Sequence, residues 1–286
     1  MSRLSEGKIM EQCKTIVITG ASDGIGAAAA RRLGRQGHRV VIVGRSPRKT
    51  GAVARQVGAD AHVADFTRLD DVRKLAADLD ASYPRIEVLA NNAGGVFGDP
   101  TRTVDGLEQT FQINHLAPFL LTQLLMDKLV VSKASVIQTT TLHGGMVRTL
   151  DVDDLNQERS FNAVRAYNAS KLENVLFAKE LHRRYHSQGV SAAAFYPGNV
   201  ATNFGSDTTS RLMKFLATNR AARTVLLTTP DKGADQLVWL AEARPGTDWQ
   251  SGEYYAKRKP GKGLNRLALD TDLARRLWER SEALLA

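Results

Sequence analysis

The segment TIVITGASDGIG, residues 15–26, decides the fold of this chain. Its first five residues are all β-branched, which is typical of a buried strand. Glycines then form a turn, and the alanine-rich stretch at residues 25–36 predicts a helix. A strand, a glycine turn and a helix in this order open a βαβ unit, so the segment predicts a parallel sheet.

Further short apolar runs predict the rest of the sheet. Each run is followed by a helix or by a loop that leads into one, and strands that are apolar throughout are typical of a parallel sheet covered on both faces. We therefore expect an α/β fold with a doubly wound parallel sheet, a three-layer α/β/α sandwich. A basic segment rich in Pro and Gly, residues 257–262, is expected to cover the surface. The predicted strands are residues 39–43, 61–63, 87–91, 135–139 and 191–196.

Length and composition favour one domain. The chain has 286 residues, no stretch resembling a linker, and 43% hydrophobic residues. We expect a single domain over residues 14–286, after a flexible extension over residues 1–13. The extension lacks the apolar core of a signal peptide and no run is long enough to span a membrane. With Cys13 as its only cysteine, the protein is expected to be soluble and cytoplasmic.

The net charge of +9 is spread along the chain, with 39 Lys and Arg among 30 Asp and Glu. Neither a basic stripe nor a recognition helix stands out, so we expect no nucleic-acid partner. A diffuse positive field suits an anionic cofactor.

The glycine turn predicts an anion cradle. Backbone at positions without side chains can approach a pyrophosphate at the positive end of the following helix. The spacing is looser than the G-x-G-x-x-G fingerprint, and the alternative is a plain strand-to-helix turn. The residues expected to contact the cofactor here are Gly20, Ser22, Asp23, Gly24, Ile25 and Gly26.

The end of the second predicted strand indicates which dinucleotide binds. An acid there would accept from the 2′-hydroxyl of NAD, but this chain has Gly44, Arg45 and Ser46. A guanidinium pairs with phosphate in bidentate fashion, so Arg45 predicts NADP(H), with NAD(H) as the alternative. Arg45 could instead be a solvated loop residue, and Asp23 argues mildly against a strong phosphate site.

Two later motifs carry a resemblance to a known family. NNAG at residues 91–94 and YNASK at residues 167–171 follow the glycine turn in order, and PGNVAT follows at residues 197–202. The chain resembles the short-chain dehydrogenase/reductase (SDR) family, a Rossmann-fold family, from residue 14 to about 260. The segments DLN (154–156), SKLENVLF (170–177) and SGEYY (251–255) are most similar to the retinol-dehydrogenase-like branch.

The resemblance implies further cofactor contacts. Asp65 would bind the adenine amino group, Val200 and Thr202 would anchor the nicotinamide, and Asn91 would help to brace the sheet. The other residues expected to line the cofactor are Phe66, Asn92, Ala93, Gly94, Pro197 and Gly198.

Tyr167 and Lys171 are the predicted catalytic pair. Four residues apart, they share one face of a helix, and a nearby ammonium would lower the pKa of the tyrosine. Tyr167 could then exchange a proton with an alkoxide or an alcohol. By resemblance, Lys171 also binds the nicotinamide ribose, and Asn114 holds a water that relays protons from Lys171. Taken singly, each residue would more often be structural.

The chain departs from the family where a serine normally orients the substrate oxygen. It reads TTTLH at residues 139–143, and alignment of the preceding strand places Thr141 at the serine position. Threonine keeps the hydroxyl but adds a methyl group and restricts χ1. His143 lies close enough to contact substrate, although a lone loop histidine is more often a surface residue.

A lid over about residues 201–229 is expected to cover the substrate. Phe97, Met146 and Phe204 would give an apolar pocket for a lipophilic carbonyl or alcohol, although they could also simply pack the lid. We expect an NADP(H)-dependent oxidoreductase, with a catalytically weak cofactor-binding sensor or scaffold as the alternative. The acids at residues 151–154 have no His or Cys beside them, so we expect a solvated loop and no metal. The resemblance makes a homodimer or homotetramer the expected assembly.

Overall fold

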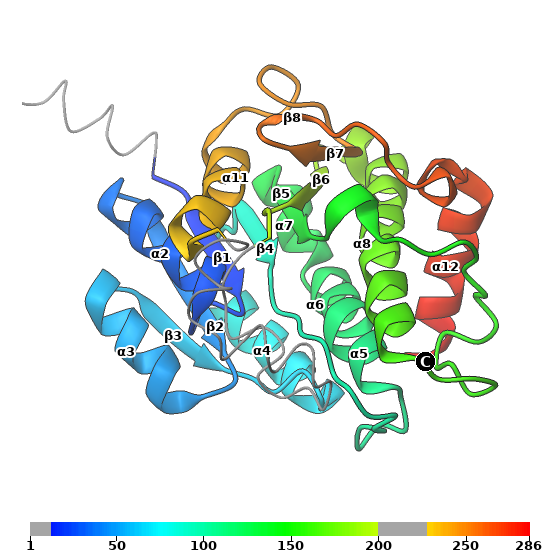
Figure 1. Cartoon of the computed structure of the whole chain (residues 1–286). Coiled ribbons are helices and arrows are strands. Elements are labelled where there is room, and N and C mark those ends of the chain that lie inside the picture. The colour runs from blue at the N-terminus through cyan, green and yellow to red at the C-terminus, as the bar shows by residue number, and fades with distance from the viewer. Residues whose placement is uncertain (1–12, 200–227) are drawn as a thin grey trace, which may run out of the picture.

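The computed structural model describes residues 13–199 and 228–286. Strands and helices alternate through the first two thirds of the chain, and the last part adds a hairpin and a terminal helix (Figure 1). The strands are β1 (Thr15–Thr19), β2 (Arg39–Gly44), β3 (Asp60–Val63), β4 (Val88–Asn91), β5 (Ser135–Thr139), β6 (Ser191–Tyr196), β7 (Glu253–Ala256) and β8 (Lys259–Pro260).

The helices lie between the strands and after them. The longest, α8, runs for 23 residues and carries both predicted catalytic residues. The α-helices are α2 (Gly24–Arg35), α3 (Pro47–Val57), α4 (Leu69–Ser82), α5 (Gln109–Phe111), α6 (Ala117–Leu124), α7 (Met126–Ser132), α8 (Ala163–Tyr185), α11 (Pro230–Glu242) and α12 (Thr271–Ala283). A π-helical turn, η1 (Gln112–Leu116), joins α5 to α6, and short 3₁₀ turns are η2 (Leu142–Gly144), η3 (His186–Gln188) and η4 (Arg266–Leu269).

One sheet of eight strands runs through the described part of the molecule in the order β3-β2-β1-β4-β5-β6-β7-β8. All neighbours are parallel except β7 and β8, which form an antiparallel hairpin. The order reverses between β1 and β4, and the crevice beyond the carboxyl ends of strands at such a point is where ligands bind in open α/β sheets. The predicted doubly wound sheet is therefore confirmed.

Alternate residues of the strands pack into two separate cores. Val17 and Val136 face the layer of α4, α6, α8 and α12, whereas Ile18 and Ile137 face the layer of α2, α3 and α11. Figure 1 shows these two groups of helices on either side of the sheet. Because both faces are covered, the central strands are buried along most of their length, as predicted, whereas the edge strands β3 and β8 are largely exposed.

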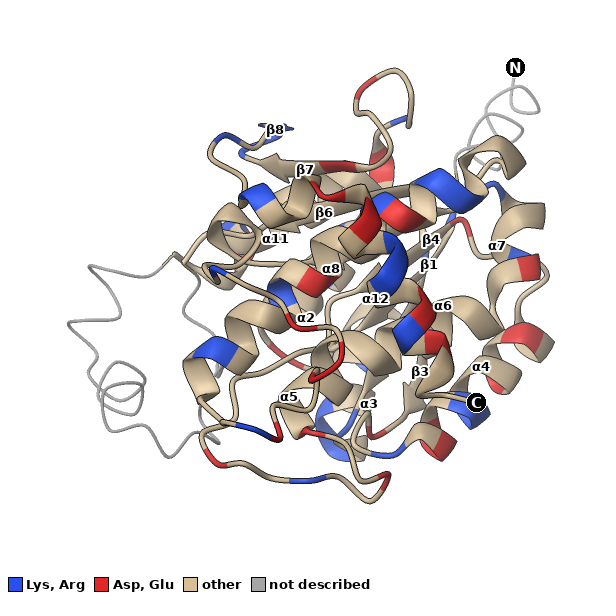
Figure 2. Ribbon diagram, turned by 90° about the vertical axis from the view of Figure 1, so that its right-hand side faces the viewer, with Lys and Arg blue, Asp and Glu red and all other residues tan. Residues whose placement is uncertain are grey.

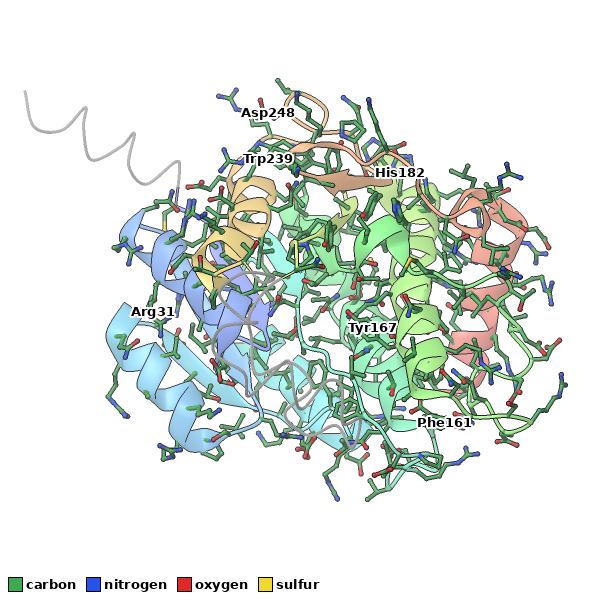
Figure 3. The ribbon with its side chains drawn as sticks, viewed as in Figure 1. Arg31, Phe161, Tyr167, His182, Trp239 and Asp248 are labelled. Carbon is green, nitrogen blue, oxygen red and sulfur yellow. The ribbon has the colours of Figure 1, made fainter. Side chains whose placement is uncertain are left out.

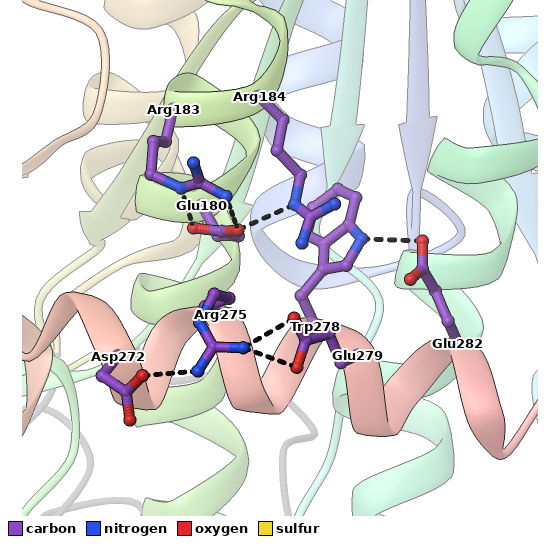
Figure 4. A network of polar contacts seen from close by, with 8 residues as sticks. All are labelled: Glu180, Arg183, Arg184, Asp272, Arg275, Trp278, Glu279 and Glu282. Carbon is purple, nitrogen blue, oxygen red and sulfur yellow. Dashed lines mark hydrogen bonds and ion pairs between the residues drawn. The ribbon is translucent and has the colours of Figure 1, made fainter.

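The terminal helix α12 closes the outer side of α8. Trp278 of α12 is buried against Phe119 and Phe177, and the Arg184 guanidinium lies 4.8 Å above its ring. Figure 4 shows the polar edge of this contact, where Arg183 and Arg184 both hold the buried Glu180 carboxylate. The sequence patterns predicted neither α12 nor the last two strands, β7 and β8.

The surface of the described residues carries charges of both signs. On the face shown in Figure 2, Lys and Arg alternate with Asp and Glu over α8 and α12. Most of residues 257–262 are exposed, as predicted, and Lys259 and Pro260 among them form β8. The predicted extension over residues 1–13 lies outside the described residues except for Cys13, which is exposed. Over residues 13–199 and 228–286, no helix combines the length and the apolar character that a membrane span requires.

Candidate active site

The glycine turn opens onto the N-terminus of α2. Asp23 caps the helix, because its Oδ1 accepts from the Gly24 N–H at 2.8 Å. Gly20 has φ +65°, which favours glycine, and a Cβ at Gly26 would lie 2.6 Å from the Gly20 carbonyl oxygen. The turn therefore keeps its close backbone approach only with glycine at these positions. Ser22 and Ile25 belong to the same turn and first helical residues.

Thr19 and Asn92 fix the position of this turn. The Thr19 hydroxyl accepts from the backbone N–H groups of Asn92 and Ala93, each at 3.0 Å. The Asn92 amide donates to the carbonyl oxygen of Thr19 at 3.0 Å, and its oxygen accepts from the Thr139 hydroxyl at 3.3 Å. The ends of β1, β4 and β5 are thereby tied together. Sequence reasoning included Asn92 and Ala93 but missed Thr19, whose only signal is its place directly before Gly20.

Arg45 follows β2 beside the glycine turn. A Cβ added at the neighbouring Gly44 would lie 2.8 Å from the Ser22 Cβ, so the segment after β2 and the glycine turn are in close contact. Arg45 is exposed, and Lys49 in the first turn of α3 holds the Asp23 carboxylate at 3.2 Å. Since Lys49 offsets the charge of Asp23, this acid is less unfavourable to a phosphate than the sequence alone indicated.

Asp65 and Phe66 come directly after β3. Asp65 Oδ1 accepts from the Thr67 N–H at 3.0 Å, which fixes the loop, and the Phe66 ring is buried. The Phe66 carbonyl accepts from the buried side chain of Gln112 at 3.1 Å. These contacts hold the loop at the carboxyl end of the sheet, where the resemblance implies an adenine contact.

Tyr167, Thr141 and Lys171 come together at the carboxyl end of β5. The Thr141 side chain lies close enough to the Tyr167 hydroxyl to lower its pKa, and the Lys171 ammonium lies 5.6 Å from the centroid of the Tyr167 ring. Lys171 is buried and donates to the Thr139 carbonyl oxygen at 3.4 Å. Figure 3 shows Tyr167 near the middle of the molecule. The structure thus brings together three of the four residues that the sequence predicted to be catalytic, and the fourth, Asn114, is described below.

The three consecutive threonines have different partners. The buried Thr140 hydroxyl donates to the Lys171 carbonyl oxygen at 2.7 Å, so it anchors α8 to β5. The Thr139 hydroxyl donates to Asn92, as described above. Thr141 is therefore the one of the three whose hydroxyl reaches Tyr167.

The pKa of Tyr167 departs from the expectation. Burial raises it to about 12, and the Thr141 hydrogen bond only partly opposes this effect. Burial also lowers the pKa of Lys171 to about 8, so its charge is easily lost in this site. The sequence predicted a lowered pKa for the tyrosine, which is wrong for the protein alone, because burial disfavours the phenolate more than Thr141 favours it.

Asn114 braces the loop after β4 with its side chain. Its amide oxygen accepts from the Gly95 N–H at 2.8 Å, and its nitrogen donates to the Gly95 carbonyl and the Ser170 hydroxyl, both at 3.0 Å. A Cβ at Gly94 would lie 2.9 Å from the Asn114 Oδ1 and 3.1 Å from the Lys171 Nζ. Gly94 therefore leaves room for both groups.

The backbone at Asn114 has its own irregularity. Pro118 lies four residues later and has no N–H to give to the Asn114 carbonyl in a regular α-helix, and the chain widens there into the π-helical turn η1. The backbone carbonyl of Asn114 therefore suits the expected water better than the Asn114 side chain, which already contacts Gly95 and Ser170. Sequence reasoning missed this irregular backbone, although Pro118 was a signal for it. Sequence reasoning also missed Ser170 as a partner of Asn114.

Two of the expected substrate residues, His143 and Met146, lie in the segment after β5. His143 has φ +57°, an uncommon conformation for a residue other than glycine, and its ring faces Gly263. Met146 is 69% exposed, and the Phe97 ring packs partly buried against Gly95. His143 and Met146 belong to the segment that follows Thr141, whereas Phe97 belongs to the loop after β4.

The segment after β6 is described only at its start. Pro197 and Gly198 follow β6, and Gly198 has φ +90°. Val200, Thr202, Phe204 and residues 201–227 of the expected lid lie outside the described residues. Among the residues that are described, no group of three or more His, Cys, Asp or Glu side chains could hold a metal ion.

Comparisons with known proteins give the relatives of this chain. The family model described as short chain dehydrogenase matches residues 14–212. DnrU of Streptomyces sp. (strain C5), whose name describes a daunorubicin C-13 ketoreductase, is 42% identical over 94% of this chain and 92% of its own length. Human retinol dehydrogenase 13 is 36% identical over 95% and 84% of the two chains.

Solved structures show the same fold. An uncharacterized protein from Mycobacterium paratuberculosis has a TM-score of 0.74 and 30% identity over 96% of both chains. A metagenomic short-chain oxidoreductase in complex with NADP has a TM-score of 0.59 and 27% identity, and covers 81% of this chain and 91% of its own. The chain therefore belongs to the short-chain dehydrogenase/reductase family of NAD(P)-binding oxidoreductases, which act on alcohol and ketone groups.

Proposed function

We propose that the protein is an NADP(H)-dependent oxidoreductase that interconverts a lipophilic ketone or aldehyde and its alcohol. The observation that carries this proposal is the contact between Thr141 and Tyr167 beside the buried Lys171. A catalytically weak sensor would not need these three groups in one place.

The glycine turn fits a dinucleotide. Its glycines leave backbone exposed at the N-terminus of α2, and a side chain at Gly26 would collide with the turn itself. When bound, the nicotinamide supplies or accepts the hydride. Arg45 would pair with the 2′-phosphate from the end of β2, with Lys49 beside it.

Proton transfer falls to Tyr167. Because burial keeps the pKa of Tyr167 near 12, its hydroxyl carries a proton at neutral pH and can donate it to a developing alkoxide. Thr141 would hold the same substrate oxygen by a second hydrogen bond. Lys171, when charged, stabilises negative charge on Tyr167 after the proton has left. Because burial lowers the pKa of Lys171 to about 8, this stabilisation by the Lys171 charge is lost as pH becomes alkaline.

The substrate class is drawn from the residues near Thr141. Met146, five residues after Thr141, and Phe97, in the loop after β4, would offer apolar surface to such a substrate. The relatives named above act, by their names, on retinol, a lipophilic alcohol, and on a ketone of daunorubicin. We propose that the substrate is a bulky lipophilic ketone. We also propose that the protein is cytoplasmic and that it forms a dimer or tetramer.

The first test is cofactor binding. Titration of the protein with NADPH and NADH should show tighter NADPH binding, and Arg45→Asp should weaken NADPH at least tenfold more than NADH, because a guanidinium facing a phosphate contributes more than about 1.4 kcal/mol. Arg55→Asp makes the same charge change at the other end of α3 and should leave the preference intact. Equal losses for both cofactors with Arg45→Asp would exclude 2′-phosphate recognition.

The second test is turnover. Tyr167→Phe removes the hydroxyl but keeps the ring, so NADPH oxidation with lipophilic ketones should fall by about 10² or more while NADPH affinity is retained. Undiminished activity would show that another group donates the proton. Binding without turnover in the unchanged protein, across a panel of ketones, aldehydes and quinones, would favour the sensor.

A further inference from the structure

The loop that follows Thr141 has an unusual backbone. It comprises residues 142–147, and three consecutive residues within it have positive φ. These are His143 at +57°, Gly144 at +71° and Gly145 at +102°. A positive φ is unfavourable for a residue that has a Cβ, so His143 keeps this conformation only if other parts of the fold hold the loop.

Asn265, just before η4, holds this loop by its carbonyl groups. Its backbone N–H donates to the His143 carbonyl oxygen at 2.9 Å. Its side-chain amide donates to the carbonyl oxygens of Gly145 at 2.8 Å and Val147 at 2.9 Å. The amide oxygen accepts from the Leu267 N–H at 3.0 Å, so both ends of the side chain are used. One residue, more than a hundred positions away in the chain, thus holds three carbonyls of loop 142–147.

Loop 142–147 also lies against the turn of α8 that follows Tyr167. A Cβ added at Gly145 would lie 2.2 Å from the Asn168 carbonyl oxygen and 3.0 Å from the Leu172 backbone nitrogen, so the backbones touch. The Met146 N–H donates to the Asn168 Oδ1 at 3.0 Å. The loop is therefore packed directly beside the predicted catalytic tyrosine.

Two residues of the loop expose large apolar side chains at this place. Leu142, directly after Thr141, is 40% exposed, and Met146 is 69% exposed. Exposed apolar surface next to reacting groups is the kind of surface that a lipophilic ligand covers. Where these two side chains lie depends on the backbone that Asn265 holds.

We propose that Asn265 is a positioning residue that sets the substrate preference of the site. It keeps loop 142–147 in its uncommon conformation, and with it Leu142 and Met146 beside Tyr167. These two side chains contact the apolar part of a bulky ketone and not its reacting carbonyl, so Asn265 governs the binding of bulky ketones rather than the chemical step. This inference rests on the proposed function and deepens it.

The test compares Asn265→Asp with the unchanged full-length protein. Asp keeps the shape and the oxygen that accepts from Leu267, but it cannot donate to Gly145 and Val147, which leaves two carbonyl oxygens unpaired. Asn265→Ser has a single hydroxyl proton and no charge, so it should give the same result and excludes an effect of the added charge. Asn162→Asp is the matched control, because Asn162 is the exposed N-cap of α8 and Asp caps a helix equally well.

Reduction of 2-acetonaphthone, a bulky aryl ketone, and of butanone measures the preference. In both Asn265 variants, KM for 2-acetonaphthone should rise about tenfold or more with kcat and NADPH affinity unchanged, because the lost contacts are the same in the ground state and the transition state. Butanone offers little apolar surface, so its kcat/KM should stay within about twofold. In a background with Leu142→Ala and Met146→Ala, Asn265→Asp should raise KM no further. Equal losses for both ketones, or an equal rise in KM in that background, would overturn the inference.

Hydrogen exchange separates failure of this inference from failure of the proposed function. The Gly144 and Gly145 N–H groups are hydrogen-bonded to Thr141 and Leu142, so their exchange reports opening of the loop. In Asn265→Asp, peptides covering loop 142–147 should exchange about tenfold faster or more, whereas those of α2 should keep their rates. Unchanged loop exchange would overturn the inference whether or not the protein reduces ketones. Faster loop exchange in a protein that reduces no ketone would support the hold of Asn265 on the loop and contradict the proposed function.

Discussion

His115 makes the folded protein sensitive to acid. Its side chain is 1% exposed in η1, with the Phe111 ring stacked at 5.7 Å and the Phe119 ring at 6.1 Å. Nε2 contacts the Ser281 hydroxyl of α12 at 3.1 Å, and Nδ1 is buried without a hydrogen-bond partner among the described residues. Burial lowers the pKa of His115 from 6.5 to about 3, although Asn174 partly opposes the shift.

The sign and size of the effect follow from proton linkage. Because the folded pKa is depressed, the stabilisation is present above the unfolded pKa of about 6.5 and is lost as pH falls toward the folded pKa. Between pH 7 and pH 5 the unfolded chain takes up a proton at His115 and the folded protein does not. The free energy of unfolding should therefore fall by about 2 kcal/mol from this residue alone.

Urea unfolding at pH 7 and pH 5 measures this loss. His115→Gln keeps a polar side chain near Ser281 but cannot titrate, so the unchanged protein should lose about 2 kcal/mol more than the variant between these pH values. If His115→Gln loses as much stability as the unchanged protein, the reasoning from burial is refuted.

Two further substitutions test the cofactor cradle and the substrate oxygen site. Gly26→Ala places a Cβ 2.6 Å from the Gly20 carbonyl oxygen, so NADPH affinity measured by titration should fall at least tenfold, whereas Gly51→Ala, with only an ordinary contact in α3, should not change it. Thr141→Val removes the hydroxyl that reaches Tyr167, so kcat for ketone reduction should fall by about 10² or more. Thr141→Ser keeps a hydroxyl and should retain activity. An active Thr141→Val variant would mean that another group orients the substrate oxygen.

The sequence by itself determined the repeating strand-to-helix pattern and the cofactor turn. These features depend on local chemistry, because β-branched runs favour strands and glycines permit the close turn at Gly20 and Gly26. The four-residue spacing of Tyr167 and Lys171 likewise fixes their shared helix face before any tertiary contact forms. Predicted strand ends agreed with the structure within about one residue, with β1, β5 and β6 matching in full.

Only the tertiary structure decided how these groups behave. The pKa of Tyr167 depends on how much solvent the packed protein removes, which no spacing reveals. Lys49 offsets Asp23 across 26 positions of sequence, and the Asn92 side chain ties β1 to β5. Contacts between residues distant in the chain are set by the packing of whole elements, so their energies exist only once the fold has brought them together.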